Sequence, residues 1–181
     1  MPDTVEDAKS PDGGTDLVTG ARVEYEAEVG LPPERMWALA TDVSRIGEWS
    51  PECVQGAWLG SGPGLPRVGS RFEARNQYTP TVSIEVLCEV TEAAQPGVFA
   101  WAVLDDERTV EHAGSLWRYE FRPGSAPDRT LVRHSFEHGL GITGLRVAVD
   151  QDPAHAAEIL RGRLDQLRGN MSATIAAMAR S

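Results

Sequence analysis

Alternation of apolar and polar residues predicts that most of this chain folds as β-strands. In residues 21–30, ARVEYEAEVG, four apolar residues alternate with three glutamates, which is typical of a half-buried strand. Six further segments alternate or are apolar over strand length: residues 53–60, 70–78, 81–90, 97–104, 115–122 and 130–138. Most are joined closely enough for hairpins, so we expect seven mainly antiparallel strands.

Two short helices are expected between the first and second strands. Pro32 and Pro33 suit a helix start, where a missing N–H group is harmless. Asp42 is placed to cap a second short helix. Pro51 then helps to end that helix by favouring extended geometry in the preceding residue. We expect Trp49, just before this break, to pack beneath the two helices or to plug one end of the fold.

A long helix is predicted at the end of the chain. Asp152 and Pro153 form a helix start, and the pattern runs to about Ala179. Gly162 and Gly169 fall on the face towards water, and each costs about 1 kcal/mol relative to Ala. Docking of the apolar stripe must therefore stabilise this helix. The stripe consists of Ile159, Leu160, Leu164, Leu167, Met171, Ile175 and Met178.

This order of elements predicts an α+β helix-grip fold. A curved seven-stranded antiparallel sheet has one face to cover, and only the long C-terminal helix is large enough to cover it. Side chains or a ligand must fill the space that such a sheet encloses, so a binding pocket is expected between helix and sheet. We expect residues 1–20 to be a disordered acidic tail and residues 21–181 to form a single domain.

Composition restricts the classes of partner. The 181 residues carry a formal net charge of −10, which argues against binding nucleic acid or anionic membrane surfaces. No apolar run reaches the roughly 20 residues of a membrane span, and the N-terminus does not resemble a secretory signal. A cytoplasmic location is therefore expected. The sequence does not fix the oligomeric state.

Several motifs together resemble a known family. They are PPERMWALATDVSRIGEWSPECVQGAWLG, then VGSRFEARNQY, SLWRYEFRP and the terminal helix that begins with Asp-Pro. They resemble the SRPBCC, or START and Bet v 1-like, superfamily over about residues 21–180, and within it the actinobacterial polyketide cyclase/dehydrase-like group. The resemblance implies a helix-grip fold and leaves several functions open. Such proteins include aromatic polyketide cyclases, lipid binders, and self-sacrifice proteins that intercept enediyne antibiotics.

Strand parity identifies the candidate ligand-binding residues. If the apolar faces point inward, aromatic side chains line the interior together with a few polar groups, and aromatic walls suit flat, conjugated ligands. The terminal helix contributes apolar side chains. The candidates are Phe72, Asn76, Tyr78, Phe99, Trp101, Trp117, Tyr119, Phe121, His134, Phe136, His138, Leu164, Leu167 and Met171.

The sequence contains few candidates for catalysis. His134 is the best acid or base, because the reference pKa of histidine lies near neutrality. Tyr119 is the best hydrogen-bond donor to an enolate or carbonyl oxygen. Under the self-sacrifice alternative that the family resemblance raises, Gly114 is the candidate target of radical attack. Its simpler role is that of a glycine at the end of a strand.

No cofactor or metal is predicted. His134 and His138 share a strand face but lie roughly 13 Å apart, too far to bind one metal ion without a bend. Cys53 and Cys88 have no CxxC or Cys/His context and are expected to be buried, unpaired thiols. We therefore expect a protein that binds a hydrophobic, aromatic, polyketide-like molecule. A polyketide cyclase/aromatase and an antibiotic-resistance protein remain alternatives, so the sequence leaves enzymatic activity open.

Overall fold

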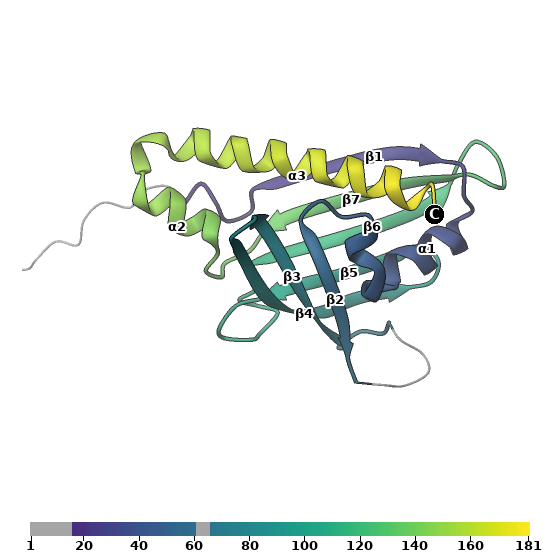
Figure 1. Cartoon of the computed structure of the whole chain (residues 1–181), viewed down its shortest axis with the longest axis horizontal. Coiled ribbons are helices and arrows are strands. Elements are labelled where there is room, and N and C mark those ends of the chain that lie inside the picture. Colours follow the sequence, from purple (N-terminus) through teal and green to yellow (C-terminus); the bar gives the residue numbers. More distant parts are fainter. Residues whose placement is uncertain (1–15, 61–65) are drawn as a thin grey trace, which may run out of the picture.

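A computed structural model describes residues 16–60 and 66–181, which form a seven-stranded antiparallel sheet gripping one long helix (Figure 1). This confirms the predicted α+β helix-grip fold. The strands lie in the order β1-β7-β6-β5-β4-β3-β2, so β1 and β2 form the two edges. The strands are β1 Arg22–Val29, β2 Cys53–Leu59, β3 Arg71–Thr79, β4 Val82–Ala94, β5 Val98–Leu104, β6 Ser115–Pro123 and β7 Thr130–His138.

Irregular pairing bends one half of the sheet. The register shifts within residues 53–55 of β2, 77–79 of β3 and 90–92 of β4. Such bulges increase the local twist and bend the strand that carries them. In Figure 1 the strands β2, β3 and β4 accordingly swing away from the direction of β1, β7 and β6. The sheet therefore curves around an interior that a single helix cannot fill.

The two short elements after β1 occur where expected, with one difference. Helix α1 spans Pro33–Thr41 and is followed by a 3-10 helix, η1, over Val43–Glu48. Asp42 precedes η1, but its carboxylate makes no capping bond to the backbone. Instead it accepts a hydrogen bond of 2.5 Å from the Ser44 hydroxyl. The predicted capping role of Asp42 is wrong, because the nearby hydroxyl is the donor that its carboxylate meets.

The C-terminal region contains one helix more than predicted. Helix α2 spans Gly144–Gln151, and a short 3-10 turn, η2, spans Pro153–His155. The long helix α3 then spans Ala156–Met178, slightly shorter than expected. The α2 segment is short, but Thr143 caps it by accepting a hydrogen bond from the Arg146 backbone N–H. As expected, Gly162 and Gly169 are exposed on α3 with open space around them.

The folded part of the chain begins before residue 20. Val18 is buried and packs with Val149 of α2 and Ala156 of α3. Asp16 accepts hydrogen bonds from the backbone of residues 18 and 19 and forms an ion pair with Arg146. The predicted disordered tail is therefore wrong for residues 16–20, because Val18 finds a buried site beside α2. Residues 1–15 of that prediction lie outside the described residues.

The interior is densely packed towards the C-terminal end of α3. There Trp37 of α1 meets Phe99 and Phe121 edge-on, with ring centroids 6.1 and 6.5 Å apart. Ile175 and Met178 of α3 are fully buried in the same cluster. One side of α3 packs closely against β1. The side that faces β2 and β3 makes far fewer contacts. Helix α1 covers the sheet only at this end, around Phe99 and Phe121, and does not reach its middle.

Two glycines allow η1 to lie directly on the backbone of β2. A Cβ atom at Gly47 would lie 2.3 Å from the Val54 carbonyl oxygen, and one at Gly56 would lie 2.4 Å from the Val43 carbonyl oxygen. Both separations are far below van der Waals contact. Trp49, as expected, is buried among the core residues beneath these elements. This close crossing fixes where residues 50–53 enter the sheet.

The outer face of the sheet carries a chain of ion pairs. Glu24 pairs with Arg133, which also lies 3.6 Å from Glu120. Arg118 lies 3.9 Å from Glu120 and 2.5 Å from Glu92. These side chains are partly exposed, so each pair contributes at most about 1 kcal/mol. These ion pairs show that the charged side chains of β6 and β7 lie on the face opposite the interior.

We expect Gly56→Ala to destabilise the protein by about 1–3 kcal/mol, because its new methyl group would force η1 away from β2. Gly162→Ala makes the same chemical change on an exposed helix face and should instead stabilise by about 1 kcal/mol. Urea unfolding of both variants measures the two effects. Equal effects of the two substitutions would contradict the close packing at the η1–β2 crossing.

Candidate functional site

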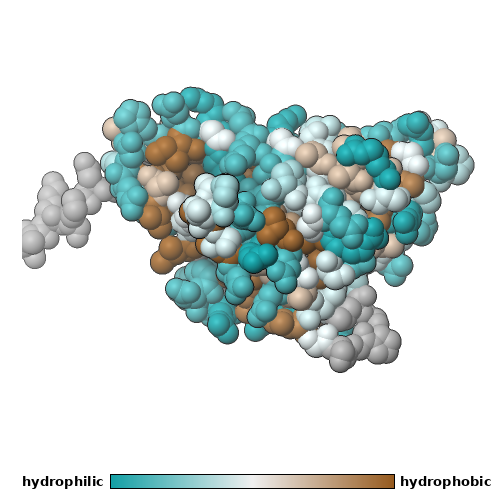
Figure 2. All heavy atoms as spheres, viewed as in Figure 1, coloured by the Kyte–Doolittle hydropathy of each residue, from teal (hydrophilic) through white to brown (hydrophobic). Residues whose placement is uncertain are grey.

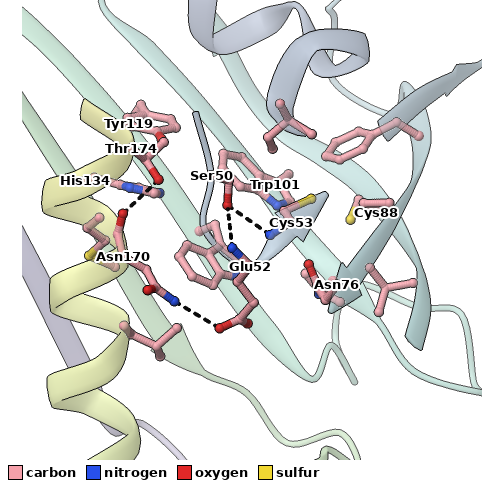
Figure 3. Close-up of a pocket in the computed structure, with 18 residues that line it drawn as sticks. Ser50, Glu52, Cys53, Asn76, Cys88, Trp101, Tyr119, His134, Asn170 and Thr174 are labelled. Atoms are coloured by element: carbon pink, nitrogen blue, oxygen red, sulfur yellow. Dashed lines mark hydrogen bonds between the residues drawn. The ribbon is translucent and has the colours of Figure 1, made fainter. Parts of the chain in front are cut away.

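A cavity of about 100 Å³, here called the inner cavity, lies between the sheet and the middle of α3 (Figure 3). Strands β3 to β7 form its walls, α3 covers it, and the segment between η1 and β2 closes one side. Its apolar lining is Ile46, Cys53, Phe72, Ala74, Val86, Cys88, Trp101, Val103, Trp117, Leu167 and Met171. Its polar lining is Ser50, Glu52, Asn76, Tyr119, His134, Asn170 and Thr174.

Aromatic rings from three neighbouring strands form one continuous wall. Trp101 of β5 and Trp117 of β6 are stacked with centroids 6.1 Å apart and planes inclined by only 4°. Tyr119 and His134 are stacked at 3.8 Å. These residues share a face because the β5–β6 and β6–β7 registers place them opposite one another. The wall offers flat surfaces against which a planar ring can pack.

His134 is the least satisfied polar group of this wall. It is only 6% exposed, and neither ring nitrogen has a hydrogen-bond partner among the described residues. Burial lowers the pKa of His134 to about 3. Burial also raises the pKa of Tyr119. Both side chains are therefore neutral near pH 7.

A polar clamp spans the opening of the inner cavity between β2 and α3. Arg163 of α3 donates to both carboxylate oxygens of Glu52, at 2.6 and 2.7 Å. The Asn170 amide, two helical turns later, donates to the same carboxylate at 3.0 Å. Figure 3 shows Asn170 reaching from the helix towards Glu52. Because the Glu52 and Arg163 side chains are only 14% and 21% exposed, this clamp is better shielded from water than the outer-face pairs.

A wider groove of about 590 Å³, here called the outer groove, adjoins the inner cavity beyond the clamp. Glu52, Asn76 and Trp117 line both spaces. The groove lies between the ends of β3 and β4 on one side and α2 and α3 on the other. Its rim includes Ile142, which is 73% exposed. Figure 2 shows apolar surface around α2 and the loop before it.

The predicted ligand-binding residues divide among three places. Phe72, Asn76, Trp101, Trp117, Tyr119, His134, Leu167 and Met171 line the inner cavity. Tyr78, Phe136 and His138 line the outer groove. Phe99, Phe121 and Leu164 line neither space. Trp37 covers Phe99 and Phe121, and Leu164 packs with the cluster around Phe136. These three side chains point inward but belong to the packed core.

Sequence reasoning missed the contribution of the segment around the Trp-Ser-Pro break. None of its residues is among the predicted ligand-binding residues, yet Ile46, Ser50, Glu52 and Cys53 line the inner cavity. The Ser50 hydroxyl accepts hydrogen bonds from the backbone N–H groups of residues 52 and 53, which holds the turn. On α3, Asn170 and Thr174 were missed although they flank the stripe at helical spacing.

His138 and Gly114 have structural roles at the outer groove. The His138 ring nitrogens lie 2.7 Å from the Thr143 hydroxyl and 3.0 Å from the Gly139 carbonyl oxygen. Gly114 lines the groove, and a Cβ atom there would lie 2.9 Å from the Thr143 methyl group. Close packing therefore accounts for this glycine. Gly141, beside it, is similarly tight, because a Cβ atom there would lie 2.4 Å from the His112 carbonyl oxygen.

Cys53 and Cys88 are unpaired, as expected, and both line the inner cavity. Burial raises the pKa of both thiols, that of Cys53 to about 11. Neither is a reactive thiolate near neutral pH. Within residues 16–60 and 66–181, no group of three His, Cys, Asp or Glu side chains is arranged to hold a metal ion. Among the described helices, none has the length and apolar character of a membrane span.

His134 should make the protein less stable as the pH falls. Its pKa is about 6.5 unfolded and about 3 folded, so unfolding takes up a proton between these values. The linkage amounts to about 2 kcal/mol between pH 7 and pH 5. His134→Phe should remove this part of the pH dependence in urea unfolding. The exposed control His112→Phe should retain it, and identical pH profiles for all three proteins would contradict a buried neutral imidazole.

The clamp should contribute more than an ordinary surface ion pair. We expect Glu52→Gln to destabilise by about 1–3 kcal/mol, because it leaves the Arg163 charge without its partner. Glu89→Gln breaks the more exposed pair with Arg71 and should cost less than about 1 kcal/mol. Hydrogen exchange should accelerate in the middle of α3 only in the first variant. Unchanged exchange there would show that the clamp does not hold the helix.

Comparisons with known proteins agree with this geometry. Residues 20–175 match the family described as polyketide cyclase / dehydrase and lipid transport. Among solved structures, a polyketide-cyclase-like protein from Corynebacterium glutamicum, Cgl2372, is 26% identical, with 88% of this chain and 89% of that one covered and a TM-score of 0.60. A search of proteins with curated functions finds no match.

Two further solved structures share the fold at lower identity. The Zhui aromatase/cyclase from Streptomyces sp. R1128 is 17% identical, with 88% and 91% of the two chains covered and a TM-score of 0.60. A START superfamily protein from Mycobacterium smegmatis is 18% identical, with 81% and 98% covered and a TM-score of 0.53. The family match covers most of the chain, and the fold and helix–sheet cavity accord with it. This chain therefore belongs to the polyketide cyclase / dehydrase and lipid transport family, within the SRPBCC-type superfamily.

Proposed function

We propose that this protein binds a hydrophobic, ring-containing small molecule of polyketide-like character between the sheet and α3. The observation that carries the proposal is the inner cavity walled by Trp101, Trp117, Tyr119 and His134. Fold membership is consistent with it, because the family description includes both cyclases and lipid transport. Flat aromatic walls favour planar ligands through offset stacking and burial of apolar surface.

The inner cavity would hold a buried end of such a ligand, and the outer groove would hold its more exposed remainder. At about 100 Å³ the inner cavity is smaller than most drug-sized binding sites, which range over about 300–1,000 Å³. The outer groove, at about 590 Å³, falls within that range. A ligand of several rings therefore places one end against the aromatic wall and its remainder near Tyr78 and Ile142. To do so it must pass the Glu52 clamp.

Binding is better supported than acid–base turnover. A general base works best when its pKa lies near the working pH, whereas that of His134 is about 3 because of burial. The cyclase alternative draws support from the printed activity of the Streptomyces relative, which shares the fold at 17% identity. That alternative requires Tyr119 and His134 to assist a folded poly-keto chain, chiefly by orienting it.

Antibiotic resistance by sequestration would need only the same binding step. Resistance by self-sacrifice would need a reactive ligand to reach Gly114, and the Thr143 methyl group covers this glycine on one side. Intact-mass analysis after exposure to an activated enediyne separates the two, because only self-sacrifice cleaves the chain. Self-sacrifice is less well supported than binding, because it also requires access to Gly114.

Filling the inner cavity should weaken binding. Ala74→Leu adds a larger side chain to the cavity wall on β3. We expect it to weaken binding of the apolar probe 2-methylnaphthalene at least tenfold, as measured by titration calorimetry. The matched control, Ala57→Leu, lies on an exposed position of the neighbouring strand and should bind the probe like the unchanged protein.

Both variants should first be compared with the unchanged protein by circular dichroism and thermal unfolding. Loss of binding in a folded Ala74→Leu variant supports the inner cavity as the site. Equal probe affinity in all three proteins would overturn the proposal, because the probe would then be bound elsewhere.

A further inference from the structure

The two nitrogens of His134 lack hydrogen-bond partners although the side chain is buried. An unpaired buried polar group costs about 1–3 kcal/mol, so such groups call for an explanation. Both nitrogens of His134 meet this description within the described residues, while its ring lies on the lining of an open cavity. Figure 3 shows the ring between Tyr119 and α3, beside the cavity.

Three polar residues of the cavity lining have hydrogen-bond partners other than His134. The Thr174 hydroxyl donates to the Asn170 carbonyl oxygen at 2.7 Å. The Asn170 amide donates to Glu52, and the Ser50 hydroxyl accepts from the backbone. Tyr119 stacks its ring face on the His134 ring, so this contact provides no hydrogen bond to the imidazole nitrogens. A partner for His134 therefore has to enter the cavity from outside the protein.

The inner cavity favours a neutral partner. Among its described lining residues, Glu52 is the single carboxylate, and Arg163 already neutralises it through two hydrogen bonds. None of these described lining residues is a Lys or Arg. An anionic ligand end would be buried without a counter-ion and would pass a carboxylate on entry. A cationic end would find its only opposite charge already paired, and burial of an unpaired charge is costly.

We propose that His134 recognises a neutral hydroxyl group on the buried ring of the ligand, so that the preferred ligands are hydroxyaromatic molecules. This inference rests on the proposed function and specifies the chemical class of its ligand. A neutral imidazole has one N–H donor and one nitrogen acceptor. The ligand hydroxyl donates to the unprotonated nitrogen, while the N–H group can bond a second ligand oxygen or a water molecule. Trp101 and Trp117 pack against the ring that carries the hydroxyl.

The proposal assigns His134 a role in specificity without proton transfer to or from a carbon centre. Its lowered pKa is consistent with this role, because a neutral ring keeps its acceptor nitrogen available throughout the physiological pH range. A site that hydrogen-bonds a hydroxyl also discriminates against analogues without one, since they leave buried polar groups unpaired. The burial of His134 and its lack of hydrogen-bond partners among the described residues both favour a ligand with a neutral hydroxyl group.

The test compares two probes of nearly the same shape, 2-naphthol and 2-methylnaphthalene. Each dissociation constant is measured by titration calorimetry for the unchanged protein, His134→Phe and the exposed control His112→Phe. We expect His134→Phe to shift the ratio of the two constants about tenfold towards 2-methylnaphthalene, the equivalent of one hydrogen bond. His112→Phe should leave the ratio within twofold. The anion 2-naphthoate should bind weakest to the unchanged protein.

A second measurement needs no substitution at the site. In ¹⁵N-labelled unchanged protein, 2-naphthol should move the imidazole nitrogen resonances of His134 much more than 2-methylnaphthalene does. An unchanged ratio, or equal resonance shifts, while both probes still bind would overturn the hydroxyl preference and leave the proposed function standing. If neither probe binds the unchanged protein, the proposed function fails and this inference fails with it.

Discussion

The structure depends on one constraint, which is that a single helix must cover a strongly curved seven-stranded sheet. The stripe of α3 provides enough apolar surface for only part of that face. The helix packs most closely along β1, and its C-terminal end joins the core that α1 covers. Ile175 and Met178 complete a solid core at that end. Around Leu167 and Met171 the helix and the bent strands β3 and β4 do not meet completely. The inner cavity is the space that this mismatch leaves.

On the side of β2, polar contacts rather than apolar packing connect the sheet to α3. Gly47 and Gly56 let η1 rest on β2 without intervening side chains, and this position delivers Glu52 to the edge of the cavity. From there its carboxylate reaches Arg163 and Asn170 on α3. The clamp therefore connects the segment before β2 to α3 at the edge of the cavity.

Strand alternation was enough to predict the seven strands and the inward position of His134, because a period of two fixes which side chains share a face. It could not distinguish cavity from core. Phe99 and Trp101 have the same parity, but Trp37 covers only the first. Glu52 escaped prediction because a charged residue after a proline break suggests solvent, and its partner lies 111 residues away. Helix α2 depends on tertiary packing with residue 18.

The same alternation separates charge from the cavity. Arg133 and His134 are neighbours in β7, yet Arg133 joins the ion pairs of the outer face and His134 faces the interior without a partner. A one-residue slip of β7 would exchange them and place a guanidinium against Trp117 and Tyr119. Pairing of β7 with both β1 and β6 opposes such a slip. The register of β7 thus keeps the aromatic wall neutral, and a protein with a net charge of −10 can present an uncharged surface to a ligand.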